Sequence, residues 1–186
     1  MDAGAIGIYE KALPPSDDWH VLLGHARQAG YGFVELAIDD DPKRLARLQW
    51  SSAERAALRD AVADTAVPVR TLILSAHRRT PLGSPVAATR QSAVDLLLRC
   101  IDLAADAGVR LIQLAGYYVY DEPHDAGCRD RFLEGLQRGL ARAAPAGVML
   151  GLETMDGEDI TSVAAAMAVL RDLRSAWLGV YPDVGN

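Results

Sequence analysis

Two stretches decide the fold: Val148-Met149-Leu150-Gly151-Leu152-Glu153 and Trp177-Leu178-Gly179-Val180-Tyr181-Pro182-Asp183. Each is a short apolar run that ends in a carboxylate, and such runs are typical of parallel strands buried on both faces. Parallel strands place their carboxyl ends at one edge of a sheet, and neighbours lie about 4.8 Å apart. Glu153 and Asp183 can therefore reach one cation, which these two runs predict at that edge.

The same two carboxylates also have a purely structural interpretation. Glu153 can be a salt-bridged residue at a strand end, since a buried glutamate without a partner is costly. Pro182-Asp183 can be a turn or the N-cap of a following helix. Two carboxylates do not complete a metal site, so the local pattern leaves both interpretations open.

Strand and helix patterns alternate along the whole chain, which predicts βαβ units and a parallel sheet. A repeat of roughly 35 residues suits a (β/α)8 TIM barrel, which has eight units and typically about 250 residues. We therefore expect one α/β domain over residues 1–186, an incomplete barrel that lacks roughly the last two strands and their helices. The pattern predicts six strands, at residues 5–9, 33–38, 69–75, 111–115, 148–153 and 178–181. It predicts five helical segments, at residues 19–29, 42–66, 85–107, 126–143 and 160–171. We expect the second segment to break near Trp50-Ser51-Ser52, where Ser51 and Glu54 would form a capping box.

Composition excludes several classes of protein. The net charge of −6 argues against nucleic-acid binding, which favours a basic surface. No apolar run reaches the roughly 20 residues that cross a bilayer, and the first residues have no signal-peptide pattern. Cys100 and Cys128 lie far apart and form no CxxC motif, so we expect a reduced, cytoplasmic protein.

Basic side chains follow two of the predicted strands. His77-Arg78-Arg79 comes directly after the third strand and Lys11 after the first. Arginine pairs bind phosphate well, although a solvated loop with ordinary surface arginines explains the cluster equally. We expect Asp39-Asp40-Asp41 to be a solvated turn that starts a helix.

With these motifs in view, the chain resembles the L-ribulose-5-phosphate (L-xylulose-5-phosphate) 3-epimerase family, a group of xylose-isomerase-like TIM barrels. The resemblance covers essentially all 186 residues in order. The segments that carry it are Gly7-Ile8-Tyr9-Glu10-Lys11-Ala12-Leu13-Pro14, Arg44-Leu45-Ala46-Arg47-Leu48-Gln49-Trp50, His77-Arg78-Arg79-Thr80-Pro81-Leu82-Gly83-Ser84, Ile112-Gln113-Leu114-Ala115-Gly116-Tyr117 and Tyr181-Pro182-Asp183-Val184-Gly185-Asn186.

The resemblance implies a divalent metal, Mn or Zn, held by two Glu, one Asp and one His. Glu153 matches the first Glu and Asp183 the Asp, while the His and the second Glu belong to later strands. Glu153 would then be both metal ligand and catalytic acid/base, in a metal site that these residues leave incomplete. Arg78, Arg79, His77 and Lys11 are the candidates for substrate binding.

The implied function is metal-dependent 3-epimerisation of a ketopentose 5-phosphate through an enediolate, impaired in this truncated chain. Two alternatives remain: an enzyme like hexulose-6-phosphate isomerase, and a non-catalytic barrel fragment. The expected partner is a phosphorylated ketose, with no nucleic acid and no membrane.

Open barrel edges would also favour self-association. We expect the inner strand faces to be partly open to water, and we assign to them Ile6, Ile8, Val34, Leu36, Ile73, Ile112, Leu114, Leu150 and Leu152.

Overall fold

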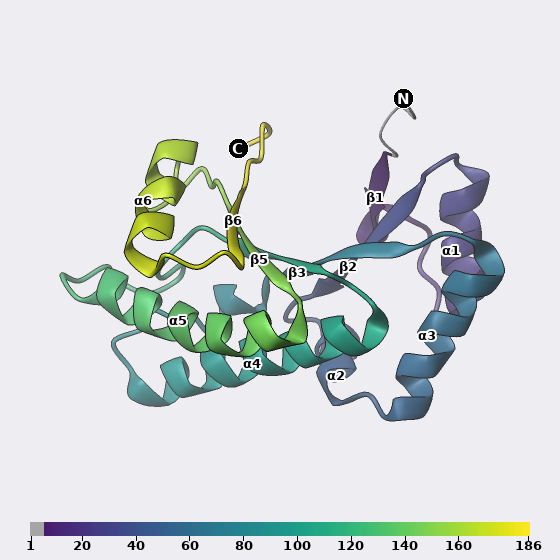
Figure 1. Cartoon of the computed structure of the whole chain (residues 1–186), viewed down its shortest axis with the longest axis horizontal. Coiled ribbons are helices and arrows are strands. Elements are labelled where there is room, and N and C mark those ends of the chain that lie inside the picture. Colours follow the sequence, from purple (N-terminus) through teal and green to yellow (C-terminus); the bar gives the residue numbers. More distant parts are fainter. Residues whose placement is uncertain (1–5) are drawn as a thin grey trace.

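The computed structural model describes residues 6–186, which form one parallel sheet and the helices that cover it (Figure 1). Ala5, the first residue of the predicted first strand, lies outside the described residues. The sheet is built from β1 (Gly7–Tyr9), β2 (Phe33–Ile38), β3 (Val69–Leu74), β4 (Leu111–Ala115), β5 (Met149–Glu153) and β6 (Leu178–Tyr181). All neighbours are parallel, and the order β1-β2-β3-β4-β5-β6 is the order along the chain, as in a TIM barrel.

The helices lie on the convex side of this curved sheet (Figure 1). They are α1 (Trp19–Gln28), α2 (Pro42–Ala46), α3 (Ser52–Thr65), α4 (Ala87–Ala107), α5 (Cys128–Ala146) and α6 (Val163–Leu173). Short 3-10 turns occupy Glu10–Ala12, Arg47–Gln49 and Ala76–Arg78. None of the helices among residues 6–186 is both long enough and apolar enough to cross a membrane.

One predicted helical region is interrupted where expected, and one helix extends further than predicted. The region predicted at residues 42–66 is divided into α2, a 3-10 turn and α3, because Ser51 caps α3 with the predicted capping box to Glu54. The segment predicted to end at Ala143 continues through Pro145 to Ala146. Pro145 lies in the last turn, and Gly147 at φ 65° ends the helix by donating its N–H to the carbonyls of Ala143 and Ala144.

The apolar strand residues that we expected on the inner face lie mostly elsewhere. Of that set, Val34, Leu36, Ile112, Leu114, Leu150 and Leu152 are at most 2% exposed and form one core with helix residues such as Leu23, Leu97 and Leu136. Alternation along each strand then turns the other residues toward the concave side. The predicted inner face was therefore wrong for these six residues.

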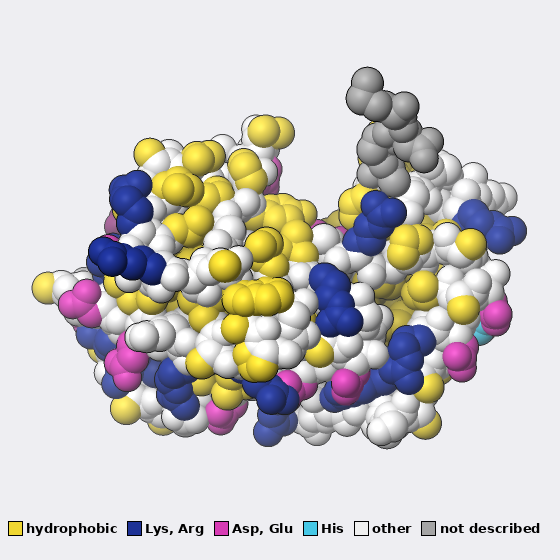
Figure 2. All heavy atoms as spheres, in the orientation of Figure 1, with side chains coloured by type: hydrophobic (Ala, Val, Ile, Leu, Met, Phe, Trp, Pro, Cys, Tyr) yellow, Lys and Arg dark blue, Asp and Glu magenta, His cyan; other side chains and the backbone are white. Residues whose placement is uncertain are grey.

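The concave side carries a polar set instead. Glu35 on β2, Thr71 on β3, Gln113 on β4, Glu153 on β5 and Tyr181 on β6 alternate with the core residues. The molecule is visibly hollowed between the arm with α6 and β6 and the arm with β1 and α1 (Figure 2). The side chains that can meet a ligand therefore project into this hollow.

Candidate functional site

Glu153 and Asp183 lie at the same edge of the sheet, as the sequence predicts. Glu153 is the last residue of β5 and pairs in register with Tyr181, the last residue of β6, so Asp183 follows two residues beyond. The Glu153 residue is 8% exposed, whereas Asp183 is partly exposed. The two carboxylates thus stand on neighbouring strands, one buried and the other at the opening.

The pKa of Glu153 reflects its surroundings and the neighbouring Asp183. Burial raises the pKa of the Glu153 carboxyl, and the neighbouring Asp183 carboxyl raises it further. The buried amide of Gln113 on β4 opposes this shift through a hydrogen bond. Two carboxyl groups in contact resist ionising together, and this arrangement gains most from a nearby cation.

The donor set fits part of a divalent cation site. Two carboxylates on adjacent strand ends suit a hard cation, which prefers oxygen ligands. No group of three or more His, Cys, Asp or Glu residues in residues 6–186 is arranged to hold a metal ion. Glu153 and Asp183 stay candidates for two of the ligands of such a site.

A second polar group lies on the concave side beside this pair. Thr71 Oγ1 donates a 2.7 Å hydrogen bond to Glu35 Oε2, and Tyr181 Oη lies 3.4 Å from the same oxygen. Burial raises the pKa of Glu35, and the two hydroxyl contacts oppose the shift. Burial also raises the pKa of Tyr181 to about 12, so the phenol is neutral and acts as donor. Neither Glu35 nor Gln113 was among the predicted site residues, although each is a polar residue inside an apolar run, the same signal that marked Glu153.

The two predicted arginines have different environments. Arg79 Nη1 pairs with Asp121 at 2.7 Å, and its Nε lies 3.6 Å from Asp40. Arg78 is exposed and has no carboxylate partner among residues 6–186; its guanidinium lies 4.5 Å from the ring centroid of Tyr120. Of the two, Arg78 is the one with charge available for an anion.

Tyr117 connects Arg78 to the carboxylate pair. Its ring packs 5.2 Å from that of Tyr120, and its buried hydroxyl has no hydrogen-bond partner in the described structure. Burial raises the pKa of Tyr117; the charge of Arg78 opposes the shift and that of Glu153 adds to it. The Tyr117 hydroxyl is therefore close enough to both charges for them to affect its pKa.

His77 and Lys11 are engaged by the protein itself. His77 is buried, and its Nε2 lies 3.0 Å from the carbonyl oxygen of Ala93 on α4. Lys11 Nζ pairs with Asp39 at 3.0 Å. A ligand would have to compete with these contacts, so substrate binding by either residue stays a prediction.

Asp39 is not the solvated residue that we expected. It is 5% exposed and receives hydrogen bonds from Lys11 and from Arg44, the latter at 2.8 Å. Burial opposes ionisation of Asp39, but these two cations outweigh burial and hold its pKa below the usual range. Asp41 does cap α2, as expected for a helix start.

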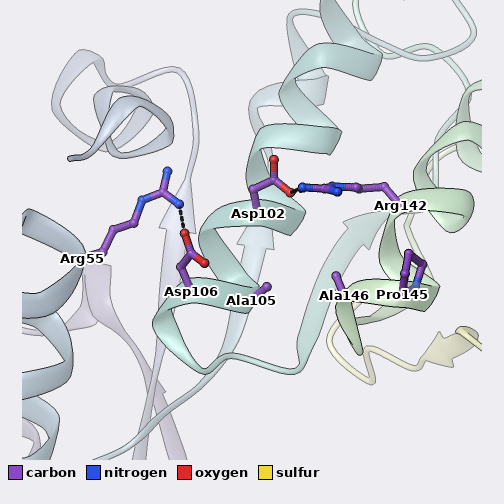
Figure 3. A pocket seen from close by; sticks show the side chains of 7 residues that line it. All are labelled: Arg55, Asp102, Ala105, Asp106, Arg142, Pro145 and Ala146. Carbon is purple, nitrogen blue, oxygen red and sulfur yellow. Dashed lines mark hydrogen bonds and ion pairs between the residues drawn. The ribbon is translucent and has the colours of Figure 1, made fainter. Parts of the chain in front are cut away.

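A surface pocket lies at the other end of the molecule (Figure 3). It is lined by Arg55 on α3, Asp102 and Asp106 on α4, and Arg142 on α5. Arg55 pairs with Asp106 and Arg142 with Asp102. These residues lie near the connections that enter the amino ends of β4 and β5, away from Glu153, and their charges already neutralise one another.

Comparison with known proteins agrees with this geometry. The profile of the family described as xylose isomerase-like TIM barrel matches residues 23–186. L-ribulose-5-phosphate 3-epimerase UlaE from Salmonella heidelberg (strain SL476) is 42% identical over 181 residues, which cover 97% of this chain and 64% of that protein. The chain thus spans less than two thirds of the length of this relative.

Two solved structures share the fold at low identity. D-psicose 3-epimerase from Clostridium cellulolyticum H10, with D-tagatose, superposes with a TM-score of 0.82 at 17% identity, over 96% of this chain and 63% of that one. A xylose isomerase-like TIM barrel protein from Mycobacterium smegmatis, in complex with magnesium, gives 0.74 at 17% identity, over 98% and 65%. On the profile match and the strand order, this chain belongs to the xylose isomerase-like TIM barrel family.

Proposed function

We propose that this protein is a metal-dependent 3-epimerase of a ketopentose 5-phosphate, either L-ribulose 5-phosphate or L-xylulose 5-phosphate. The observation that carries the proposal is the position of the buried Glu153 carboxyl and of Asp183 at neighbouring strand ends on the carboxyl edge of the sheet. Barrel enzymes do their chemistry at this edge. The name of the Salmonella relative supports the substrate, and the magnesium complex of the Mycobacterium protein supports a divalent cation.

Epimerisation at C3 requires removal of the proton alpha to the C2 carbonyl. A divalent cation, when bound, would polarise that carbonyl and make the proton more acidic. Glu153 and Asp183 would hold the cation, and Glu153 would also take the C3 proton as general base. Inversion requires a proton to return on the opposite face, and we assign only the first of these transfers to the described residues.

The central test is exchange of the C3 hydrogen. The protein expressed from its own gene is incubated with L-ribulose 5-phosphate and Mn²⁺ in D₂O, and deuterium at C3 is measured by NMR. We expect exchange that falls at least about 100-fold in Glu153→Gln, since a general base contributes about 10² to 10⁴ in rate. Glu134→Gln, an exposed residue on α5, is the matched control. Equal exchange in wild type and Glu153→Gln would contradict the assignment.

The products formed in the same samples distinguish the epimerase from the isomerase and from a non-catalytic barrel fragment. A 3-epimer as product supports the epimerase, and an aldose phosphate supports the isomerase, because both reactions pass through an enediolate. No exchange in wild type would contradict the epimerase and support a non-catalytic barrel fragment. Self-association and a cytoplasmic location stay predictions; the two free, buried cysteines are compatible with a reducing compartment.

We propose further that Arg78 binds the substrate phosphate. Its guanidinium lacks a carboxylate partner among residues 6–186, whereas Arg79 pairs with Asp40 and Asp121. Arg78→Gln should raise the KM for L-ribulose 5-phosphate by about tenfold or more, since hydrogen bonds to charged groups contribute about 1.5 to 3 kcal/mol. Arg79→Gln is the control, and unphosphorylated L-ribulose should be insensitive to both changes. An equal KM in wild type and Arg78→Gln would remove Arg78 from the site.

A further inference from the structure

Thr154 joins the two strand ends that carry the carboxylates. It follows Glu153 directly and is 7% exposed. Its backbone N–H donates to the carbonyl of Tyr181 at 3.2 Å, which extends the β5–β6 pairing by one bond. Only alternate residues of a parallel strand bond to a given neighbour, so the next ladder bond would run from the Asp183 N–H to the Thr154 carbonyl. That bond is replaced, because the Asp183 N–H donates to the Thr154 side chain instead.

Beyond the last backbone hydrogen bond between β5 and β6, the Thr154 side chain binds the Asp183 backbone. Its Oγ1 accepts the Asp183 N–H at 2.9 Å and lies 3.3 Å from the Asp183 carbonyl oxygen, to which it can donate. One hydroxyl therefore satisfies both backbone groups of Asp183. Buried backbone groups need such partners, and a threonine side chain has few rotamers, which makes it a stiff support.

Two more contacts orient the residues after β6. The Gly185 N–H donates to Asp183 Oδ1 at 2.7 Å, which restricts the rotation of that carboxylate, and Oδ2 has no hydrogen-bond partner among residues 6–186. Asn186 Nδ2 donates to the Thr154 carbonyl at 2.9 Å. The segment from Asp183 to Asn186 is thus folded back onto Thr154 at both of its ends.

We infer that Thr154 is a positioning residue whose hydroxyl fixes Asp183 relative to Glu153, so that both carboxylates meet the same divalent cation. The inference rests on the proposed function, because it assumes that these two groups are ligands. Nothing in it requires Thr154 to touch the cation or the substrate. Its effect is transmitted through the Asp183 backbone alone.

The test compares Thr154→Val, which removes the hydroxyl at similar size, with Thr154→Ser, which keeps it. Thr161→Val, an exposed threonine without a side-chain hydrogen bond in the described structure, is the control. Thermal unfolding establishes that each variant is folded. If Thr154→Val does not fold, Thr154→Ala replaces it, since it also lacks the hydroxyl.

The first readout is exchange of the Asp183 backbone amide in D₂O, followed by NMR without metal. We expect exchange about tenfold faster in Thr154→Val, as for loss of roughly 1.4 kcal/mol, and wild-type exchange in Thr154→Ser. The second readout is Mn²⁺ affinity by electron paramagnetic resonance. Thr154→Val should bind about tenfold more weakly than wild type, and Thr154→Ser and Thr161→Val should match wild type.

The outcomes separate the inference from the proposed function. Faster Asp183 exchange with unchanged Mn²⁺ affinity would overturn the positioning role and leave the proposed function intact. Equal loss of affinity in Thr154→Val and Thr154→Ser would also overturn it, since the hydroxyl would not be responsible. Absence of Mn²⁺ binding in wild type would overturn the metal dependence in the proposed function, and the inference with it.

Discussion

Tyr181 Oη on β6 lies 3.4 Å from Glu35 Oε2 on β2, although β3, β4 and β5 separate these strands in the sheet. A flat sheet would hold strands four places apart at about 19 Å, since neighbours lie about 4.8 Å apart. The contact therefore requires the sheet to curl until β2 and β6 face each other. The residues that surround the hollow are thus close enough to act together.

The Thr71–Glu35 hydrogen bond should contribute measurably to stability. Thr71→Val leaves the half-buried Glu35 carboxyl with only the longer contact from Tyr181. We expect the free energy of unfolding to fall by about 1 to 2 kcal/mol, measured by urea denaturation at pH 7. Thr89→Val on α4 is the control, because that hydroxyl has no hydrogen bond in the described structure. A loss no larger than that of the control would contradict the prediction.

His77 should make the protein less stable in mild acid. Burial lowers the pKa of His77 from 6.5 to about 4, so the folded protein holds it neutral where the unfolded chain is protonated. The stabilisation is complete above pH 6.5 and is lost as the pH falls toward 4. The free energy of unfolding should fall by about 3 kcal/mol over this range, since each pKa unit corresponds to about 1.4 kcal/mol.

The measurement is the difference in unfolding free energy between wild type and His77→Gln from pH 7 to pH 4. The glutamine amide can still donate to the Ala93 carbonyl but has no proton to gain in this range. We expect wild type to lose more unfolding free energy than His77→Gln as the pH falls. A difference independent of pH would show that His77 is not buried in the neutral form.

Ala66 ends α3 in the left-handed region, at φ 56° and ψ 21°. An L-residue is strained there and glycine is not, so Ala66→Gly should raise stability by about 0.5 to 1 kcal/mol. Ala29 ends α1 at φ −79°, where the same substitution only adds freedom to the unfolded chain. Ala29→Gly should therefore destabilise by a similar amount. Thermal unfolding measures both changes, and the same sign for both would reject this explanation.

Gly116 has no room for a side chain. A Cβ at this position would lie 2.2 Å from the Glu153 carbonyl oxygen and 2.8 Å from Ile160 Cβ. We expect Gly116→Ala to lose more than about 2 kcal/mol of stability, because the backbone at Glu153 must shift. Gly157→Ala is the control, with no atom within 4 Å of its added Cβ. A soluble Gly116→Ala protein with wild-type thermal stability would contradict the expectation.

The sequence predicts most of the elements because their signals are local. Ser51 and Glu54 form the predicted capping box, and the apolar runs that end at Glu153 and Tyr181 are strands. The face of a strand is harder to predict, because both faces of a barrel strand are covered, one by the helices and one by the barrel interior. An apolar residue in a short run fits either face, and only polar residues such as Glu35 and Gln113 carried a signal for the concave side.

The residues of the candidate site are likewise predictable from the sequence only in part. Glu153 and Asp183 are predictable because each ends an apolar run, and register alone brings neighbouring strand ends together. Asp39 illustrates what pattern reasoning misses: in the sequence it begins a polar run, yet Lys11 and Arg44 converge on it from other segments. Such charge pairing depends on distances across the fold that no local window contains.

The strand order has a consequence for how the chain folds during synthesis. Each strand pairs with the strand made just before it, and no strand among the described residues must wait for a distant partner. A growing chain can therefore add one βα unit at a time to a sheet that already exists. Domains generally fold from the N-terminus as they emerge from the ribosome, at about 5 to 20 residues per second. On this topology the carboxylate pair forms when β6 docks onto β5, after β1 to β5 have already paired.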